Sequence, residues 1–224
     1  MTFGSLPRHE RPRERLRALG PGSLSDSELL AIVLGAGTGG RNCVQVASEL
    51  LAEFGGLQPL TAASHDRLCS TSGVGTARWA TLQAALEVSR RAIGEQLRQG
   101  DALASPAAVR AFLTVWLRNR QHEVFVGLFL DSRNRLLAAE ELFRGTLTQT
   151  AVYPREVVRR AIELNAAGVI FAHNHPSGVA QPSAADRALT GVLRSALQLL
   201  EIPVLDHLIV AGPRCVSFAE SGLL

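Results

Sequence analysis

The feature that most constrains the fold is a change of hydrophobic pattern near residue 105. Between residues 25 and 98, apolar side chains recur at intervals of three and four, which predicts helices in SDSELLAIVL, CVQVASELLAEFG and ARWATLQAALEVSRRAI. Beyond residue 105, short apolar runs such as EVFVGLFLD, VIFAH and PVLDHLIVAG alternate with helical stretches such as SPAAVRAFLTVWL and PREVVRRAIELNAAG. Strands interleaved with helices indicate an α/β domain.

A short polar segment, RQGDALAS at residues 98–105, separates the two patterns. Such segments are typical of domain boundaries. We therefore predict a small helical domain at residues 1–98 and an α/β domain at residues 105–224. A chain of 224 residues is long enough for each part to bury a core.

The composition is that of a soluble globular protein, with 46% hydrophobic and 19% charged residues. The N-terminus is charged and lacks the apolar segment of a secretory leader, and no apolar run approaches membrane-spanning length. Cys43, Cys69 and Cys215 are scattered and form no CxxC pair, which argues for a reducing compartment. We expect a cytoplasmic protein without a membrane partner.

The basic charge needs a cautious interpretation. All 23 basic residues are arginine, which indicates compositional bias more than a designed patch. The segment LPRHERPRERLRALG, residues 6–20, holds five arginines against two glutamates and could attract phosphate. The plainer interpretation is a solvated, partly helical arm, and we favour it.

Two histidines stand one residue apart in FAHNHPSG, directly after an apolar run and before a turn. Along a strand, residues i and i+2 point to the same face. If the strand persists through Asn174, His173 and His175 project side by side and offer two ligands to a metal, most commonly zinc. The alternative is a hydrogen-bonded polar pair beside a turn.

An acid follows the histidines at the expected start of a helix. Asp186 comes three residues after Ser183 in PSAADRALTGVLRSALQLL, and its oxygen would complete a His-His-Asp set with a fourth position open for water. The same spacing resembles a capping box, with Asp in place of Glu. The two interpretations are compatible, because a capped first turn can hold the acid rigidly while it faces the strand end.

A hydrolytic zinc site also needs a base to move the proton of water. The upstream candidates cannot be separated from the residues alone: Glu123, Glu140, Glu141, Glu156 and Glu163. Among them, Glu123 opens a strand that is apolar on both faces and should be buried. Downstream, His207 is expected to be a hydrogen-bonded structural residue, or one that supports a ligand, and Asp206 could play the same supporting part.

The stretch STSGVGTARWATLQ resembles a helix-hairpin-helix turn. In such a turn glycine lets the backbone approach a phosphate, and the following helix N-terminus presents free N–H groups to it. Gly73, Gly75 and Arg78 are therefore candidate contacts to DNA, independent of base sequence. The bulky Trp79 could crowd a phosphate, and the alternatives are a helix-packing turn or a protein-docking surface.

Together these residues resemble a known family. HNHP, Ser183 and Asp186, with an upstream acid before an apolar strand, look like the JAMM motif of MPN-domain zinc metallopeptidases. GTL, YPREVVRRAIELNAAGVIFAHNHPSG and DHLIV resemble the bacterial RadC-like proteins more closely. This resemblance covers the whole chain. It implies a helix-hairpin-helix-like segment followed by an MPN-like, cytidine-deaminase-like α/β domain with a mixed sheet.

The resemblance also implies roles for the site residues. His173, His175 and Asp186 would bind Zn²⁺, Glu123 would be the general base for a metal-bound water, and Ser183 would stabilise the oxyanion. We therefore expect a zinc metallopeptidase or isopeptidase that hydrolyses an amide bond in an unidentified protein or peptide. The rival hypothesis is a non-enzymatic module, associated with DNA repair or the replication fork, whose metal is structural or vestigial.

Overall fold

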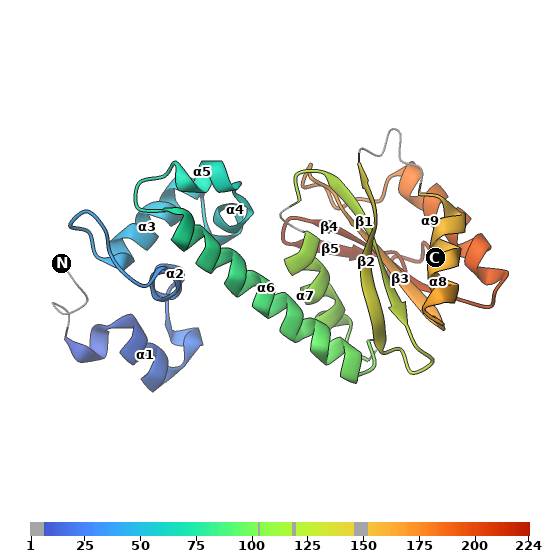
Figure 1. Cartoon of the computed structure of the whole chain (residues 1–224), viewed down its shortest axis with the longest axis horizontal. Helices are drawn as coiled ribbons and strands as arrows, with labels where there is room; N and C mark the ends of the chain where they lie inside the picture. The colour runs from blue at the N-terminus through green and yellow to red at the C-terminus, as the bar shows by residue number, and fades with distance from the viewer. Residues whose placement is uncertain (1–6, 103, 118–119, 146–151) are drawn as a thin grey trace. The chain divides into compact units, whose positions relative to one another are not determined.

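The computed structural model describes residues 7–102, 104–117, 120–145 and 152–224 (Figure 1). The chain divides into two compact units, Met1–Val88 and Ser89–Leu224. The division falls within one long helix, α6 (Thr76–Gln99). The domain limits expected at residues 98 and 105 therefore stay a prediction.

The first unit is helical in its described part. Two of its helices begin with capping boxes, from Ser25 to Glu28 and from Asn42 to Gln45, in which side chains satisfy backbone N–H groups at the helix start. A core that includes Leu30, Val46 and Leu68 holds the helices together. Before α6 the elements are η2 (Arg8–Glu10), α1 (Pro12–Leu19), η3 (Pro21–Ser23), α2 (Asp26–Leu34), α3 (Cys43–Phe54), α4 (Leu57–Ala62) and α5 (His65–Cys69).

The second unit mixes helices and strands, which confirms the predicted α/β class. Its elements after α6 are α7 (Pro106–Leu117), β1 (Glu123–Leu130), β2 (Leu136–Gly145), α8 (Pro154–Glu163), β3 (Gly168–Asn174), α9 (Ala184–Gln198), β4 (Val204–Ala211) and β5 (Arg214–Ser217). No helix in the described ranges combines the length and the apolar character needed to cross a membrane. The cytoplasmic location stays a prediction.

The five strands form one mixed sheet in the order β2-β1-β3-β4-β5. Only β3 and β4 pair in parallel, and the other neighbours are antiparallel. A parallel pair needs a crossover connection, which α9 supplies between β3 and β4. Figure 1 shows α7 against one face of this sheet and α8 with α9 against the other.

Alternation along β1 explains why this strand is buried on both faces. Val124, Val126 and Leu128 pack in the cluster on the α7 side, whereas Phe125 and Phe129 pack in the cluster with residues of α8 and α9. Strand β3, next to β1, is buried along its whole length. The HNH segment, His173 to His175, therefore lies at the end of a central strand, between β1 and β4.

Candidate metal centre

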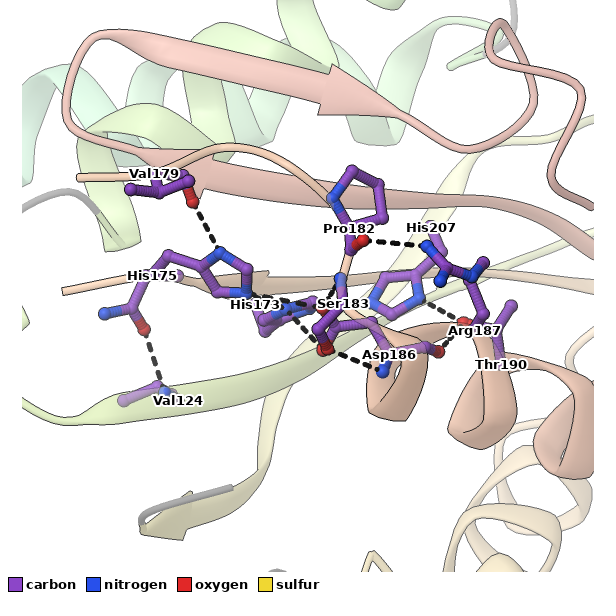
Figure 2. A network of polar contacts seen from close by, with 11 residues as sticks. Val124, His173, His175, Val179, Pro182, Ser183, Asp186, Arg187, Thr190 and His207 are labelled. Carbon is purple, nitrogen blue, oxygen red and sulfur yellow. Dashed lines mark hydrogen bonds and ion pairs between the residues drawn. The ribbon is translucent and has the colours of Figure 1, made fainter. Parts of the chain in front are cut away.

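The site forms where the end of β3 meets the first turn of α9. His173 and Asp186 are 2% and 1% exposed, and His175 follows directly after the strand. Because the backbone stays extended through Asn174, with the N–H of His175 donating to the Val210 carbonyl, both imidazoles lie on the same side. Figure 2 shows the two rings pointing toward Asp186. Sequence spacing and tertiary contact thus bring the three predicted ligands together.

The candidate ligand atoms lie close to the spacing of ligands around a tetrahedral metal. Nε2 of His173 lies 2.9 Å from Nε2 of His175 and 3.2 Å from Oδ1 of Asp186, and His175 Nε2 lies 3.5 Å from Asp186 Oδ2. Bonds of about 2.0–2.2 Å to a tetrahedral zinc place ligand atoms about 3.4 Å apart. These three residues form the candidate metal-binding group within the described ranges of the chain.

A chain of hydrogen bonds determines which nitrogen of His173 carries the proton (Figure 2). The Thr190 hydroxyl lies 2.6 Å from the Asp186 carbonyl oxygen, which can only accept, and 2.6 Å from His207 Nδ1. Thr190 therefore donates to the carbonyl and accepts from His207. His207 Nε2, left with its lone pair, accepts from His173 Nδ1 at 2.8 Å. The lone pair of His173 Nε2 is consequently directed at Asp186 and His175.

His175 is held in the equivalent tautomer by a backbone group. Its Nδ1 lies 2.6 Å from the Val179 carbonyl oxygen, to which it donates. Nε2 of His175 then carries a lone pair that meets the lone pair of His173 Nε2. Two acceptors and a carboxylate at these distances repel one another unless a proton or a cation lies between them.

The carboxylate completes the set of acceptors. Asp186 Oδ2 accepts the Ser183 backbone N–H at 2.7 Å in the capping box of α9, whereas buried Oδ1 has no hydrogen-bond partner in the described residues. Burial favours the neutral acid, but the imidazoles of His173 and His175, together with Ser183, outweigh it and hold the pKa of Asp186 well below its usual range. An ionised, buried carboxylate oxygen without a hydrogen-bond donor suits a metal ligand.

The pKa values of His175 and His207 are shifted in opposite directions. Its contact with Asp186 raises the pKa of His175, and the nearby charge of Glu123 adds to this effect. Burial, followed by the charge on His173, lowers the pKa of His207 well below its ordinary value. His207 is therefore neutral with one proton, as the hydrogen-bond chain through Thr190 requires.

Glu123 lies at the start of β1, near the site. Phe125 of β1 pairs with His173 of β3, and Glu123 stands two residues before Phe125, close enough to His175 for its charge to raise the pKa of that imidazole. Glu123 shares a sheet face with Phe125, whose ring stacks on His173 with centroids 6.2 Å apart. The other candidate acids form ion pairs with arginines: Glu140 with Arg160, Glu141 with Arg120 and Arg144, Glu156 with Arg155 and Arg159, and Glu163 with Arg159 and Arg160.

Ser183 and Asp206 have different environments. The exposed Ser183 is the N-cap of α9, and its hydroxyl oxygen accepts the Asp186 N–H at 3.1 Å, which leaves the hydroxyl hydrogen to be donated. The carboxylate of Asp206 accepts from the N–H groups of His207 and Ala219 and from the Ser217 hydroxyl. Asp206 therefore ties the end of β5 to β4 and makes none of its described bonds to the His-His-Asp group.

Sequence reasoning gave no role to Thr190 and mentioned Asn174 only as a continuation of the strand. Thr190 lies four residues after Asp186, on the same face of α9, and this spacing could have identified it. Asn174 lies between the two ligands in the HNH motif, and strand alternation predicts that its side chain leaves the opposite way.

The chain matches two known family profiles. A RadC-like JAB domain profile matches residues 103–223, and a UPF0758 N-terminal profile matches residues 4–80. The chain belongs to the RadC family. UPF0758 proteins of Nitrosospira multiformis, Halorhodospira halophila and Marinobacter nauticus are 55%, 54% and 55% identical to it, each over 100% of both chains.

In this RadC-family chain, the glycine turn lies between α5 and α6. Gly73 has φ +95°, and a Cβ there would come within 3.1–3.2 Å of the Thr38 and Val46 side chains. Arg78 donates to the carbonyl oxygens of Gly73, Ala36 and Gly37, so its guanidinium links this turn to the loop after α2. A Cβ at Gly75 would meet open space. The helix-hairpin-helix assignment and the DNA contacts of Gly73, Gly75 and Arg78 stay predictions.

Proposed function

We propose that this protein is a zinc-dependent hydrolase that cleaves an amide bond in a peptide or isopeptide substrate. The observation that carries the proposal is the convergence of three acceptors, Nε2 of His173, Nε2 of His175 and an oxygen of Asp186, whose neighbours direct the protons away. A bound cation removes the repulsion among them. Membership of the RadC-like JAB family supports the same chemical class.

The donor set favours zinc over other common metals. Two imidazoles and one carboxylate match the ligands of catalytic zinc, and three protein ligands leave a fourth position for water or substrate. When bound, zinc would polarise a carbonyl group and make water more acidic near neutral pH. His207 and Val179 hold the two imidazoles in the orientation that such a metal needs.

The remaining chemistry belongs to two side chains at the edge of the site. Glu123, whose charge acts on His175, would take the proton of the attacking water and deliver it to the leaving amine. The Ser183 hydroxyl, oriented by the Asp186 N–H, would donate to the oxyanion that develops on the substrate carbonyl. Both roles are proposals.

Metal content tests the site directly. We expect about one zinc per chain in the parent protein purified without chelator, and none in a His173→Ala/His175→Ala variant, because two of three ligands are lost. A His9→Ala/His65→Ala variant is the matched control, since it removes two exposed histidines that lie outside the site. A parent that holds no zinc, even after reloading, would count against the proposal.

Hydrolysis tests the assigned base. We expect Glu123→Gln to keep its zinc and to lose about 10²–10⁴-fold in rate, because general base catalysis is removed while the ligands remain. The measurement is mass spectrometry of a peptide library incubated with zinc-loaded or chelated protein. Glu156→Gln, which alters a partly exposed ion pair on α8, should leave the products unchanged. Loss of zinc in Glu123→Gln would show that the acid is misassigned.

A further inference from the structure

The side chain between the two metal-ligand candidates makes its own set of bonds. Asn174 is 2% exposed, and alternation along β3 directs it away from His173 and His175. Its Oδ1 accepts the Val124 backbone N–H at 2.8 Å. Its Nδ2 donates to the carbonyl oxygens of Arg120 and His122, at 3.2 and 3.0 Å. Both donor hydrogens and one acceptor of the amide are thus used.

All three partners belong to the backbone that leads into β1 and flanks Glu123. The last pair between β1 and β3 on this side is Phe125 with His173. Beyond that pair, the side-chain amide of Asn174 replaces the backbone hydrogen bonds of the ladder. It bonds to the backbone of His122, before Glu123, and of Val124, after it. The position of Glu123 relative to the histidines therefore depends on a side chain of the HNH motif.

We infer that Asn174 is a positioning residue that holds Glu123 in register with the metal ligands. The inference rests on the hydrolase proposed above, in which Glu123 is the base. Strand alternation lets the three HNH residues serve two faces at once, with His173 and His175 toward the metal and Asn174 toward the backbone of β1.

Only an amide of this length fits the three partners. Aspartate has the same shape, but it would turn a carboxylate oxygen toward the carbonyls of Arg120 and His122 and would offer them no donor. Alanine would leave the Val124 N–H and both carbonyls without this partner. Both substitutions should loosen the start of β1 while they leave the metal ligands in place.

Hydrogen exchange of the metal-free protein tests the three hydrogen bonds of Asn174 without a measurement of hydrolysis. We expect the Val124 amide to exchange about tenfold faster or more in Asn174→Ala, since a buried group loses its partner. In Asn174→Asp the acceptor remains but the two carbonyls are repelled, so exchange at Val124 should also rise, by less. Ser217→Ala, which removes a partly buried hydrogen bond to Asp206 between β4 and β5, is the control for general destabilisation. Unchanged Val124 exchange in Asn174→Ala would overturn the inference.

Cobalt binding tests the position of Glu123. In the Co²⁺-loaded parent, the ¹³C signal of the Glu123 carboxyl should be broadened by the nearby paramagnetic ion. In Asn174→Asp, Co²⁺ should still bind and the broadening should fall, a change that general destabilisation in Ser217→Ala would not produce. Unchanged broadening in Asn174→Asp would overturn the inference about Asn174 and would leave the proposed hydrolase standing.

The two proposals fail in different ways. A parent that binds Co²⁺ but shows no broadening of Glu123 overturns both the assigned base and its positioning by Asn174. A parent that binds no Co²⁺ contradicts the proposed hydrolase, and the exchange of Val124 then decides whether Asn174 clamps the start of β1.

Discussion

At the scale of single residues, Thr190 determines which nitrogen of His173 carries the proton, although the two side chains make no direct hydrogen bond. Its hydroxyl must donate to the Asp186 carbonyl and therefore accepts from His207, and His207 in turn accepts from His173. Thr190 thus sets the lone pair that His173 would present to a metal through one intermediate group, the imidazole of His207. Hydrogen-bonded partners of this kind orient a ligand and raise its basicity.

Replacing Thr190 tests this chain. Thr190→Val keeps the shape of the side chain but removes the acceptor for His207, so we expect zinc affinity to fall about 10–100-fold. Thr190→Ser retains the hydroxyl and should keep an affinity close to that of the parent. A competition titration with a chromophoric zinc chelator measures both variants. Equal affinities of the valine variant and the parent would contradict the assigned tautomers.

At the scale of elements, the capping box of α9 makes two hydrogen bonds between Ser183 and Asp186. Ser183 satisfies the Asp186 N–H through its hydroxyl, and the Ser183 backbone N–H holds Asp186 Oδ2. The same device begins α2, where Ser25 and Glu28 form a capping box far from the site in sequence. Capping accounts for the helix start in both places, and only the serine of α9 adjoins the candidate metal group.

The two caps provide matched variants. Ser183→Ala and Ser25→Ala should each lower the free energy of unfolding of their own unit by about 1 kcal/mol, because each loses an N-cap. Only Ser183→Ala should also slow amide hydrolysis, by about 10²–10³-fold if its hydroxyl binds the oxyanion. Urea unfolding and product formation measure the two effects. Equal hydrolysis rates in both variants would reduce Ser183 to a structural cap.

A second element-scale contact joins α8 to the edge strand β2. Arg160 donates to both carboxylate oxygens of Glu140, at 2.5 and 2.7 Å. The bond from Arg160 lowers the pKa of Glu140 from its ordinary value of 4.5, although burial opposes this. The pair therefore stabilises the fold fully above pH 4.5, and the contribution is lost as the pH falls through the lowered pKa.

Glu140→Gln tests this pH dependence. We expect the free energy of unfolding at pH 7 to fall by about 0.5–1 kcal/mol, because the pair is bidentate but partly exposed. The difference between variant and parent should shrink as the pH is lowered below 4.5, where the parent carboxylate becomes protonated. Urea unfolding at a series of pH values measures the difference. A difference that stays constant down to the lowest pH would contradict the role of this ion pair.

At the scale of the whole molecule, each unit has its own hydrophobic core. The core of the first unit runs from Leu30 to Leu82 in sequence. One of the two clusters of the second unit includes Leu97 and Ala102, with Ile93 packed against it, so it reaches into the last turns of α6. The end of α6 therefore contributes to the stability of the second unit, the one that contains the sheet.

Two fragments test this assignment. We expect residues 89–224 alone to unfold cooperatively and to bind zinc with the affinity of the full chain. A fragment that begins at residue 105 loses Ile93, Leu97 and Ala102 from the core and should be less stable by about 2–5 kcal/mol, the range for a large buried truncation. Calorimetry and zinc titration compare the fragments. Equal stability would place the functional boundary at residue 105, as the sequence suggested.

The sequence by itself determined the fold class and the three candidate ligands. Local patterns account for both. Apolar residues at intervals of two predict strands, and those at intervals of three and four predict helices. His173 and His175 lie at the end of one strand, and Asp186 lies at the start of one helix. The capping box at Ser183 was also predictable, because a cap depends only on neighbours within one turn.

Tertiary structure decided what depends on contacts between distant segments. The residues alone did not separate five candidate acids, the family resemblance pointed to Glu123, and the fold brings the charge of Glu123 close enough to raise the pKa of His175. The partners of Asn174 lie 50 to 54 residues away along the chain, and Thr190 meets His207 across 17 residues. Side-chain tautomers and the position of a base follow from such long-range hydrogen bonds, and no local periodicity encodes them.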